Sequence, residues 1–280
     1  MNRKTIVTLL LAALCLLAVQ VAAQTPSSPT PTPSPRPTTV LVVNYMKVKG
    51  DIIGLQRDLW MPVHKESVKT GKMAGWSSWS VRWAAKNSEY DFITVDAYNK
   101  WADLEKSPWT KETWDKVHPN VKLEDVGKRT EAARDIVRRD VLGMIAQTEA
   151  LAGAPAAKYV IVDYYQSAPD KRSDYVKLER ETYLPMHQEA VKSGKMAFWQ
   201  FYTVIGAGSE NSYGFITVRG YAKWEDIGAG GGPTVLAKVH PNLKPEDLAK
   251  TMREARTLAK SQILTLVDQV LPPAPAAAGQ

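Results

Sequence analysis

Two separate stretches of the chain carry nearly the same sequence. Residues 60–76 read WMPVHKESVKTGKMAGW, and residues 183–199 read YLPMHQEAVKSGKMAFW. Each stretch holds a Pro-x-His element and, further on, a Gly-Lys-Met element shortly before a tryptophan. Agreement of this kind is the first sign of an internal repeat, because a copied folding unit keeps its important residues in register.

The agreement continues on both sides of these stretches, over residues 40–149 and 158–271. The four histidines of the chain occupy two positions, and each position is used twice. Other matched pairs are Tyr45 with Tyr164, Arg57 with Arg180, Trp101 with Trp224, His118 with His240, and residues 90–95 with 213–218. The sequence therefore predicts two fused copies of one unit, joined by a hinge at 150–157 and followed by a disordered tail at 272–280.

The first 39 residues are expected to direct and tether the protein. A short basic start, Asn2-Arg3-Lys4, precedes an apolar run from Ile6 to Val19 and small residues at 21–23. This pattern predicts a secretory signal peptide, residues 1–23, cleaved after Ala23. An uncleaved anchor is the alternative, although the run is short for a membrane span. Residues 24–39 form a linker rich in Pro, Ser and Thr. We expect a periplasmic or secreted protein without a membrane span after cleavage.

Cysteine content and charge narrow the class of function. The only cysteine, Cys15, lies in the predicted signal peptide, so the exported chain has no disulfide and depends on its core for stability. The formal net charge is +7, but basic and acidic residues alternate on the predicted helices, as in residues 128–131. That pattern indicates a solvated surface and argues against a nucleic-acid partner.

The spacing of apolar residues predicts the same order of elements in each copy. Strands are expected at 40–47 and 159–166, a helix at 54–70, hairpin strands at 73–83 and 89–98, a short helix at 100–106 and an amphipathic helix at 123–138. Residues 141–147 and 263–270 either end that helix or form a fourth strand, and we favour the strand. This order is typical of an α+β ferredoxin-like unit. Two such units can cover each other's bare sheet faces and enclose a pseudo-dimeric α+β barrel.

The second copy carries the residues of a family resemblance. They are Leu178-Glu179-Arg180, Tyr183-Leu184-Pro185-Met186-His187, Gly194-Lys195-Met196 and Trp199. This pattern resembles the dimeric α+β barrel superfamily, most closely its NIPSNAP and stress-responsive barrel branch and their secreted bacterial relatives. The resemblance implies units that pair through their sheets, and it leaves a further oligomer open. The superfamily includes cofactor-free monooxygenases, haem-degrading oxygenases, chlorite dismutase-like haem proteins, isomerases and members without known activity, so fold alone does not name a reaction.

The Pro-x-His element allows two interpretations. Pro62 and Pro185 each remove a backbone hydrogen bond from the predicted helix, which should kink there. His64 and His187 follow, each on one flank of its helix. Each imidazole is either an acid, base or ligand at the edge of a cavity, or a structural group that satisfies the kinked backbone and packs on its neighbour. We favour the structural role.

Two polar residues in the first strands are further catalytic candidates. Asn44 and Asp163 interrupt runs that are otherwise apolar. In cofactor-free monooxygenases and haem degraders of the resembled superfamily, a first-strand asparagine and a nearby tryptophan contribute to the site. The resemblance therefore implies a role for Asn44 together with Trp76 or Trp79, although the second copy carries an aspartate at this position.

Aromatic residues are the candidates for contact with a ligand. We expect a small apolar or aromatic molecule in or beside the barrel, in contact with Trp60, Trp76, Trp79, Tyr183, Trp199 and Tyr202. Trp109 and Trp114 are expected at the rim of such a pocket. Two alternatives remain open: an enzyme that acts on the molecule by cofactor-free oxygenation, isomerisation or haem chemistry, and a structural or interaction module of the cell envelope.

No cofactor or metal is predicted. His118 and His240 precede Pro-Asn and are expected to serve a turn, because no partner at metal-ligand spacing accompanies them. The chain lacks a Cys-x-x-Cys-His motif, so only non-covalent haem stays open.

Overall fold

A computed structural model describes residues 39–151, 154–207, 213–228 and 232–272. The predicted signal peptide, nearly all of the linker and nearly all of the tail lie outside the described residues. Within the described ranges, no helix combines the length and the apolar character needed to cross a membrane.

The two halves of the chain contain the same succession of elements. In the first half these are β1 (Val40–Val48), α2 (Ile52–Leu55), the π-helical segment η1 (Gln56–Trp60), α3 (Met61–Lys69), β2 (Gly75–Val81), β3 (Phe92–Tyr98), the 3-10 segment η2 (Trp101–Glu105), α4 (Lys111–Val117), α5 (Leu123–Ala133) and β4 (Arg134–Gln147). In the second half they are β5 (Tyr159–Gln166), the 3-10 segment η3 (Pro169–Lys171), α6 (Arg172–Leu178), the π-helical segment η4 (Glu179–Tyr183), α7 (Leu184–Lys192), β6 (Phe198–Ala207), β7 (Phe215–Tyr221), the 3-10 segment η5 (Trp224–Asp226), α8 (Pro233–Val239), α9 (Pro245–Ala255) and β8 (Thr257–Val270).

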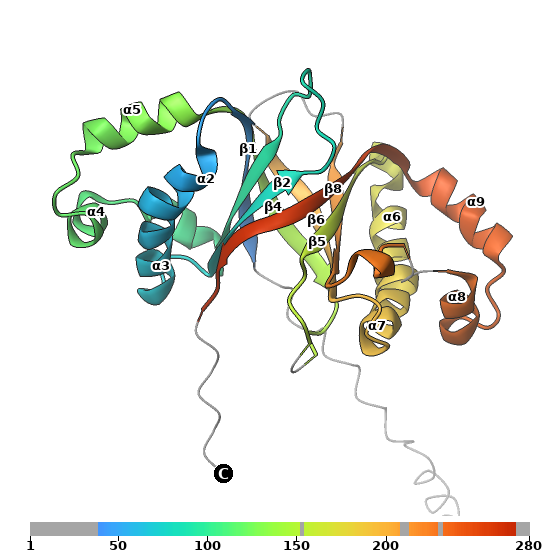
Figure 1. Cartoon of the computed structure of the whole chain (residues 1–280). Helices are drawn as coiled ribbons and strands as arrows, with labels where there is room; N and C mark the ends of the chain where they lie inside the picture. Colours follow the sequence, from blue (N-terminus) through green and yellow to red (C-terminus); the bar gives the residue numbers. More distant parts are fainter. Residues whose placement is uncertain (1–38, 152–153, 208–212, 229–231, 273–280) are drawn as a thin grey trace, which may run out of the picture. The chain divides into compact units, whose positions relative to one another are not determined.

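Eight antiparallel strands close into one barrel. The first half contributes the sheet β4-β1-β3-β2, and the second half contributes β8-β5-β7-β6. The two sheets join at both edges, because β2 pairs with β8 and β4 pairs with β6. The α+β fold prediction is confirmed, and Figure 1 shows the helices of each half packed outside the strands, away from the helices of the other half.

Alternation along the strands separates a lumen from two outer faces. Leu41, Val43 and Tyr45 of β1 line an apolar lumen of about 120 Å³, while the neighbouring Asn44 and Met46 line the outer side. Because successive side chains of a strand point to opposite faces, a polar residue at position 44 is placed outside the lumen, toward the helices.

The last strand of each half is longer than predicted. The strands at 141–147 and 263–270 are confirmed, but β4 and β8 each comprise 14 residues. β4 begins directly after α5, and β8 begins one residue after α9. The prediction of a helix to residue 138 is wrong, since α5 ends at Ala133. Residues 134–139 instead pair with β1, and this tertiary pairing overrides their local helical preference.

The glycines expected to end the Pro-x-His helices do so. Gly71 has a φ of 71° and Gly194 a φ of 73°, the left-handed conformation that glycine adopts without steric cost. Lys72 then donates its backbone N–H to the Ser67 carbonyl, and Lys195 donates to the Ala190 carbonyl. Each helix is thereby turned back toward the following strand.

Candidate functional site

The proline of each Pro-x-His element is accommodated by a π-helical turn. The segments η1 and η4 stand directly before the helices that begin with Met61-Pro62 and Leu184-Pro185. The backbone N–H of Met61 donates to the Gln56 carbonyl, five residues back, and that of Leu184 donates to Glu179. A π turn widens the helix by one residue, so the missing proline N–H does not break it.

A histidine from the His-Pro-Asn turn satisfies a carbonyl at each kink. His118 Nε2 lies 2.9 Å from the Leu59 carbonyl oxygen, and His240 Nε2 lies 3.1 Å from that of Thr182. Since a carbonyl only accepts, each Nε2 carries the hydrogen. It is therefore His118 and His240, rather than His64 and His187, that bond to the backbone of the π-helical turns. The rings of His64 and His187 stack on Trp76 and Trp199, as the structural interpretation expects.

The continuous helical segment of α2, η1 and α3, which we call the kinked helix because of its π-helical turn, covers a cavity of about 210 Å³ on the outer face of the first-half sheet. The equivalent segment of the second half is α6, η4 and α7. We call the cavity the first-half cavity. Its lining comes from β1, β2, β3, β4, the kinked helix and the loop before α4, and comprises Asn44, Met46, Gln56, Trp60, His64, Trp76, Thr94, Asp96, Trp109, Arg134, Ile136 and Arg139. Ile136 and Arg139 are exposed, so the cavity reaches solvent beside β4.

His64 is a buried, neutral side chain in this cavity. Its ring stacks on Trp76 with a centroid separation of 4.6 Å and an interplanar angle of 14°. Burial lowers the pKa of His64 to about 3, so the imidazole is uncharged at neutral pH. Three buried nitrogens among the lining residues have no hydrogen-bond partner within the described chain: His64 Nδ1, Trp109 Nε1 and Arg134 Nε.

The sheet side of the cavity carries a chain of polar contacts. Arg139 Nε donates to Asn44 Oδ1 at 2.7 Å, and Asn44 Nδ2 lies 3.2 Å from Asp96 Oδ2 and 3.3 Å from Thr94 Oγ1. Burial raises the pKa of Asp96 to about 7, and the Asn44 hydrogen bond and Arg139 oppose that rise. Asp96 can therefore exchange a proton near neutral pH.

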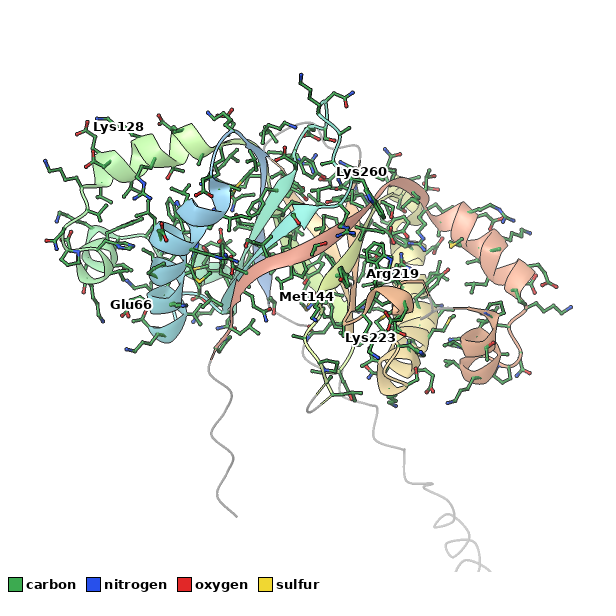
Figure 2. All side chains as sticks on the ribbon, in the orientation of Figure 1. Glu66, Lys128, Met144, Arg219, Lys223 and Lys260 are labelled. Carbon is green, nitrogen blue, oxygen red and sulfur yellow. The ribbon has the colours of Figure 1, made fainter. Side chains whose placement is uncertain are left out.

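The second half has an equivalent but smaller cavity of about 120 Å³, which we call the second-half cavity. It is lined by Asp163, Tyr165, Glu179, Tyr183, His187, Trp199, Thr217, Arg219 and Arg256. Here the charges are paired. Arg219, labelled in Figure 2, contacts Asp163, and Arg256 Nη1 lies 3.0 Å from Glu179 Oε1.

The second-half histidine is held as its counterpart is. His187 stacks on Trp199 at 5.1 Å and 26°. Burial lowers the pKa of His187 to about 3, with Arg219 and Arg256 contributing. The two halves thus share the aromatic and histidine framework and differ in the charged residues around it.

The six predicted ligand residues are divided among three cavities. Trp60 and Trp76 line the first-half cavity, and Tyr183 and Trp199 line the second-half cavity. Trp79 and Tyr202 lie in the barrel lumen instead. There Trp79 Nε1 donates to Ser77 at 2.8 Å and Tyr202 donates to Gln200 at 2.9 Å, so both polar atoms are already satisfied.

The four catalytic candidates lie in the two outer cavities, His64 with Asn44 and His187 with Asp163. Trp109 lines the first-half cavity as expected, but Trp114 is 5% exposed and packs in the core with Trp60 at 5.3 Å. The rim position predicted for Trp114 is therefore wrong.

Sequence reasoning did not identify the charged lining residues Asp96, Arg134 and Arg139. The two arginines fall in the segment predicted as helix. A register shift of the β1–β4 pairing between Tyr45 and Met46 places residues 134, 136 and 139 on one outer face. The signal available in the sequence was the interruption of the apolar strand FITVDAY by Asp96.

Comparisons with known proteins agree with the fold. A scan against protein-family profiles finds no match, and a search of curated protein sequences finds none. Among solved structures, a candidate monooxygenase of Fusobacterium nucleatum superposes with a TM-score of 0.51 and 9% identity, over 83% of this chain and 94% of that one.

Two further structures give lower scores. An anthrone oxidase-like protein aligns with a TM-score of 0.45 and 12% identity, over 87% of this chain and 97% of that one. A mutant chlorite dismutase of Candidatus Nitrospira defluvii gives 0.44 and 12%, over 84% and 93%. Sequence identities this low support a conclusion about the fold only. The chain has the dimeric α+β barrel fold, with both sheets supplied by one polypeptide.

Proposed function

We propose that the protein binds a small planar molecule in the first-half cavity, between the kinked helix and the outer face of the sheet. The observation that carries this proposal is the lining itself. Three tryptophans surround a cavity into which three buried nitrogens, one each from His64, Trp109 and Arg134, bring unused hydrogen-bonding capacity. Buried polar atoms without a partner are rare in native proteins, and a ligand site accounts for them.

The dimensions fit one or two aromatic rings. An apolar cavity of roughly 150 Å³ is known to hold benzene, and the first-half cavity is about 210 Å³. Trp60 and Trp109 meet edge to face with centroids 6.3 Å apart, so an inserted ring can contact the face of one and the edge of the other. The second-half cavity also holds three buried polar atoms without a hydrogen-bond partner, His187 Nδ1, Glu179 Oε1 and Arg256 Nε. It is smaller, however, and its charges form ion pairs, so we assign the binding to the first half.

Calorimetric titration with naphthol tests this proposal. We expect one molecule to bind per chain, with affinity reduced about tenfold or more in Trp109→Leu, because a lost aromatic contact and hydrogen bond together reach that scale. Trp101→Leu is the matched control, since Trp101 is 46% exposed and lies outside the cavity. Equal affinity in the two variants, or no binding by the unsubstituted protein, would refute the proposal.

A second candidate function is an enzyme that removes a proton from the bound molecule. It is favoured by Asp96, whose pKa is about 7, in the same cavity as the neutral His64. A base with a pKa near the working pH is effective in proton transfer. Proton removal begins both isomerisation and cofactor-free oxygenation, and the fold is shared with a candidate monooxygenase. Turnover of a bound phenol that Asp96→Asn abolishes, with binding retained, would establish this role.

Haem does not fit the first-half cavity of this structure. A porphyrin contains four pyrrole rings, whereas about 210 Å³ is the scale of one or two rings. His64 is also stacked face to face on Trp76, which fixes the direction of its ring.

We further propose that the chain is exported. We also propose that its two halves are copies of one unit and that, within the superfamily, the chain is most similar to the NIPSNAP branch. The basic start, the apolar run and the small residues at 21–23 support export. N-terminal sequencing of the protein from its native source should begin at or near Gln24. A chain that keeps Met1 in the cytoplasm would contradict export.

A further inference from the structure

The two outer cavities differ at one pair of equivalent positions on the kinked helices. Gln56 and Glu179 both begin the π-helical segment of their half. Arg134 and Arg256 both stand where the amphipathic helix passes into the last strand. In the second half the pair forms an ion pair of 3.0 Å. In the first half the helical residue at this position is Gln56, whose side chain is an uncharged amide.

Arg134 is therefore a partly buried cation that, within the described chain, has no direct ion pair; Asp96 is the nearby acid whose charge it feels. Among the described residues, no carboxylate lies within 4.0 Å of its guanidinium, whereas Arg256 has Glu179 at 3.0 Å. The Nε atoms of both arginines are buried without a hydrogen-bond partner, so the ion pair is what distinguishes the two halves. Burial lowers the pKa of Arg134, the neighbouring Arg139 lowers it further, and Asp96 opposes this shift. A partly buried charge is costly unless it is paired.

The charges around the first-half cavity do not balance. Asp96 is the one acidic residue among its described lining residues, and Arg134 and Arg139 face it. Asp96 also accepts from Asn44. In the second half, Asp163 and Glu179 match Arg219 and Arg256, and Ser261 pairs with β5 where Arg139 pairs with β1.

We infer that the first-half cavity selects an aromatic carboxylate, with Arg134 binding the carboxylate and the ring lying against Trp60 and Trp109. This inference rests on the proposed function and adds the chemical class of the ligand. A guanidinium presents Nε and a neighbouring Nη as a fork that matches the two oxygens of a carboxylate. The ligand would supply to Arg134 the group that Glu179 supplies to Arg256.

Titrations with naphthoate and naphthamide test the inference. The two molecules share ring and size, and differ in charge. We expect naphthoate to bind about tenfold or more tightly, since a hydrogen bond to a charged group is worth that much when desolvated. Gln56→Glu should remove this preference, because it places in the first half the carboxylate that the second half already has.

Lys65→Glu is the matched control for Gln56→Glu. It adds negative charge to the same helix, but Lys65 is exposed and lies outside the cavity lining. We expect Lys65→Glu to keep the preference for naphthoate. Equal loss in both variants would show a general charge effect and overturn the assignment to Arg134.

The outcomes separate the inference from the proposed function. Equal affinity for naphthoate and naphthamide in the unsubstituted protein overturns the inference but not the proposed function. A preference for naphthoate that survives in Gln56→Glu has the same consequence. Failure of naphthol, naphthoate and naphthamide alike overturns both. If Gln56→Glu does not fold, the comparison of the two molecules with the unsubstituted protein still decides.

Discussion

Asp96 and His64 line one cavity, and burial favours the uncharged form of both. For His64 this means a lowered pKa, and for Asp96 a raised one. Their effects on stability therefore run in opposite directions along the pH scale. A buried acid raised to about 7 stabilises the fold below its ordinary pKa of 3.8, and this contribution is lost as the pH rises through 7.

Replacing Asp96 by asparagine should remove this pH dependence. We expect Asp96→Asn to gain stability relative to the unsubstituted protein as the pH rises from 3.8 to 7, by at most about 4 kcal/mol, since one pKa unit corresponds to about 1.4 kcal/mol. Urea unfolding over that range measures it. Asp91→Asn is the control: Asp91 pairs with Lys47 at 3.1 Å, so its loss should not stabilise. A parallel offset at every pH would contradict the assignment.

His64 and His187 predict acid sensitivity. Their folded pKa is about 3 and their ordinary pKa 6.5, so their contribution is present above 6.5 and is lost as the pH falls toward 3. His64→Phe keeps a ring against Trp76 and cannot be protonated. We expect a shallower loss of stability in acid for this variant, measured by urea unfolding. An unchanged slope between 6.5 and 3 would show that His64 is already charged in the folded protein.

At the scale of elements, each π-helical turn depends on a histidine from a distant turn. His118 donates to the Leu59 carbonyl and His240 to the Thr182 carbonyl. His118→Ala leaves a carbonyl at the kink without its partner, so we expect a loss of about 1–3 kcal/mol of unfolding free energy. Chemical denaturation measures this, and His240→Ala should lose a similar amount. A His118→Ala variant as stable as the unsubstituted protein would show that water replaces the imidazole.

The order of elements could be predicted from the sequence, whereas the local irregularities could not. Apolar spacing and the repeated glycines gave the strands, the kinked helix and its end, because these depend on neighbouring residues. The π turn at Gln56 and the register shift at Met46 depend on contacts far along the chain. Those irregularities bring Arg134 into the cavity. For this reason the sequence indicated Asn44, His64 and the tryptophans as site candidates but did not indicate Arg134.

At the scale of the whole molecule, the two halves close one barrel and share its interior. Tyr213 of the second half donates to Asp140 of the first at 2.6 Å, and Tyr90 donates to Gln262 in the reverse direction. Lys260, labelled in Figure 2, donates to Tyr90 at 2.9 Å. Each half would expose its lumen face and two unpaired strand edges if it opened alone.

The barrel should therefore unfold in a single step. We expect one calorimetric transition whose measured enthalpy equals the van't Hoff enthalpy. Val43→Ala and Val162→Ala each remove buried methyl groups from the lumen, one in each half, and both should lower the midpoint of that same transition. Two transitions, with each substitution moving only one of them, would show that the halves are independent.

The first-half cavity is the proposed ligand site, and a crystal structure of the protein grown with naphthoate would show whether the ligand lies there. We predict electron density for one naphthoate against Trp60 and Trp109, with its carboxylate within hydrogen-bond distance of Arg134 and with the second-half cavity and the barrel lumen free of it. Naphthoate in the lumen beside Trp79, or in the second-half cavity beside Glu179, would show that the first-half cavity is not the binding site.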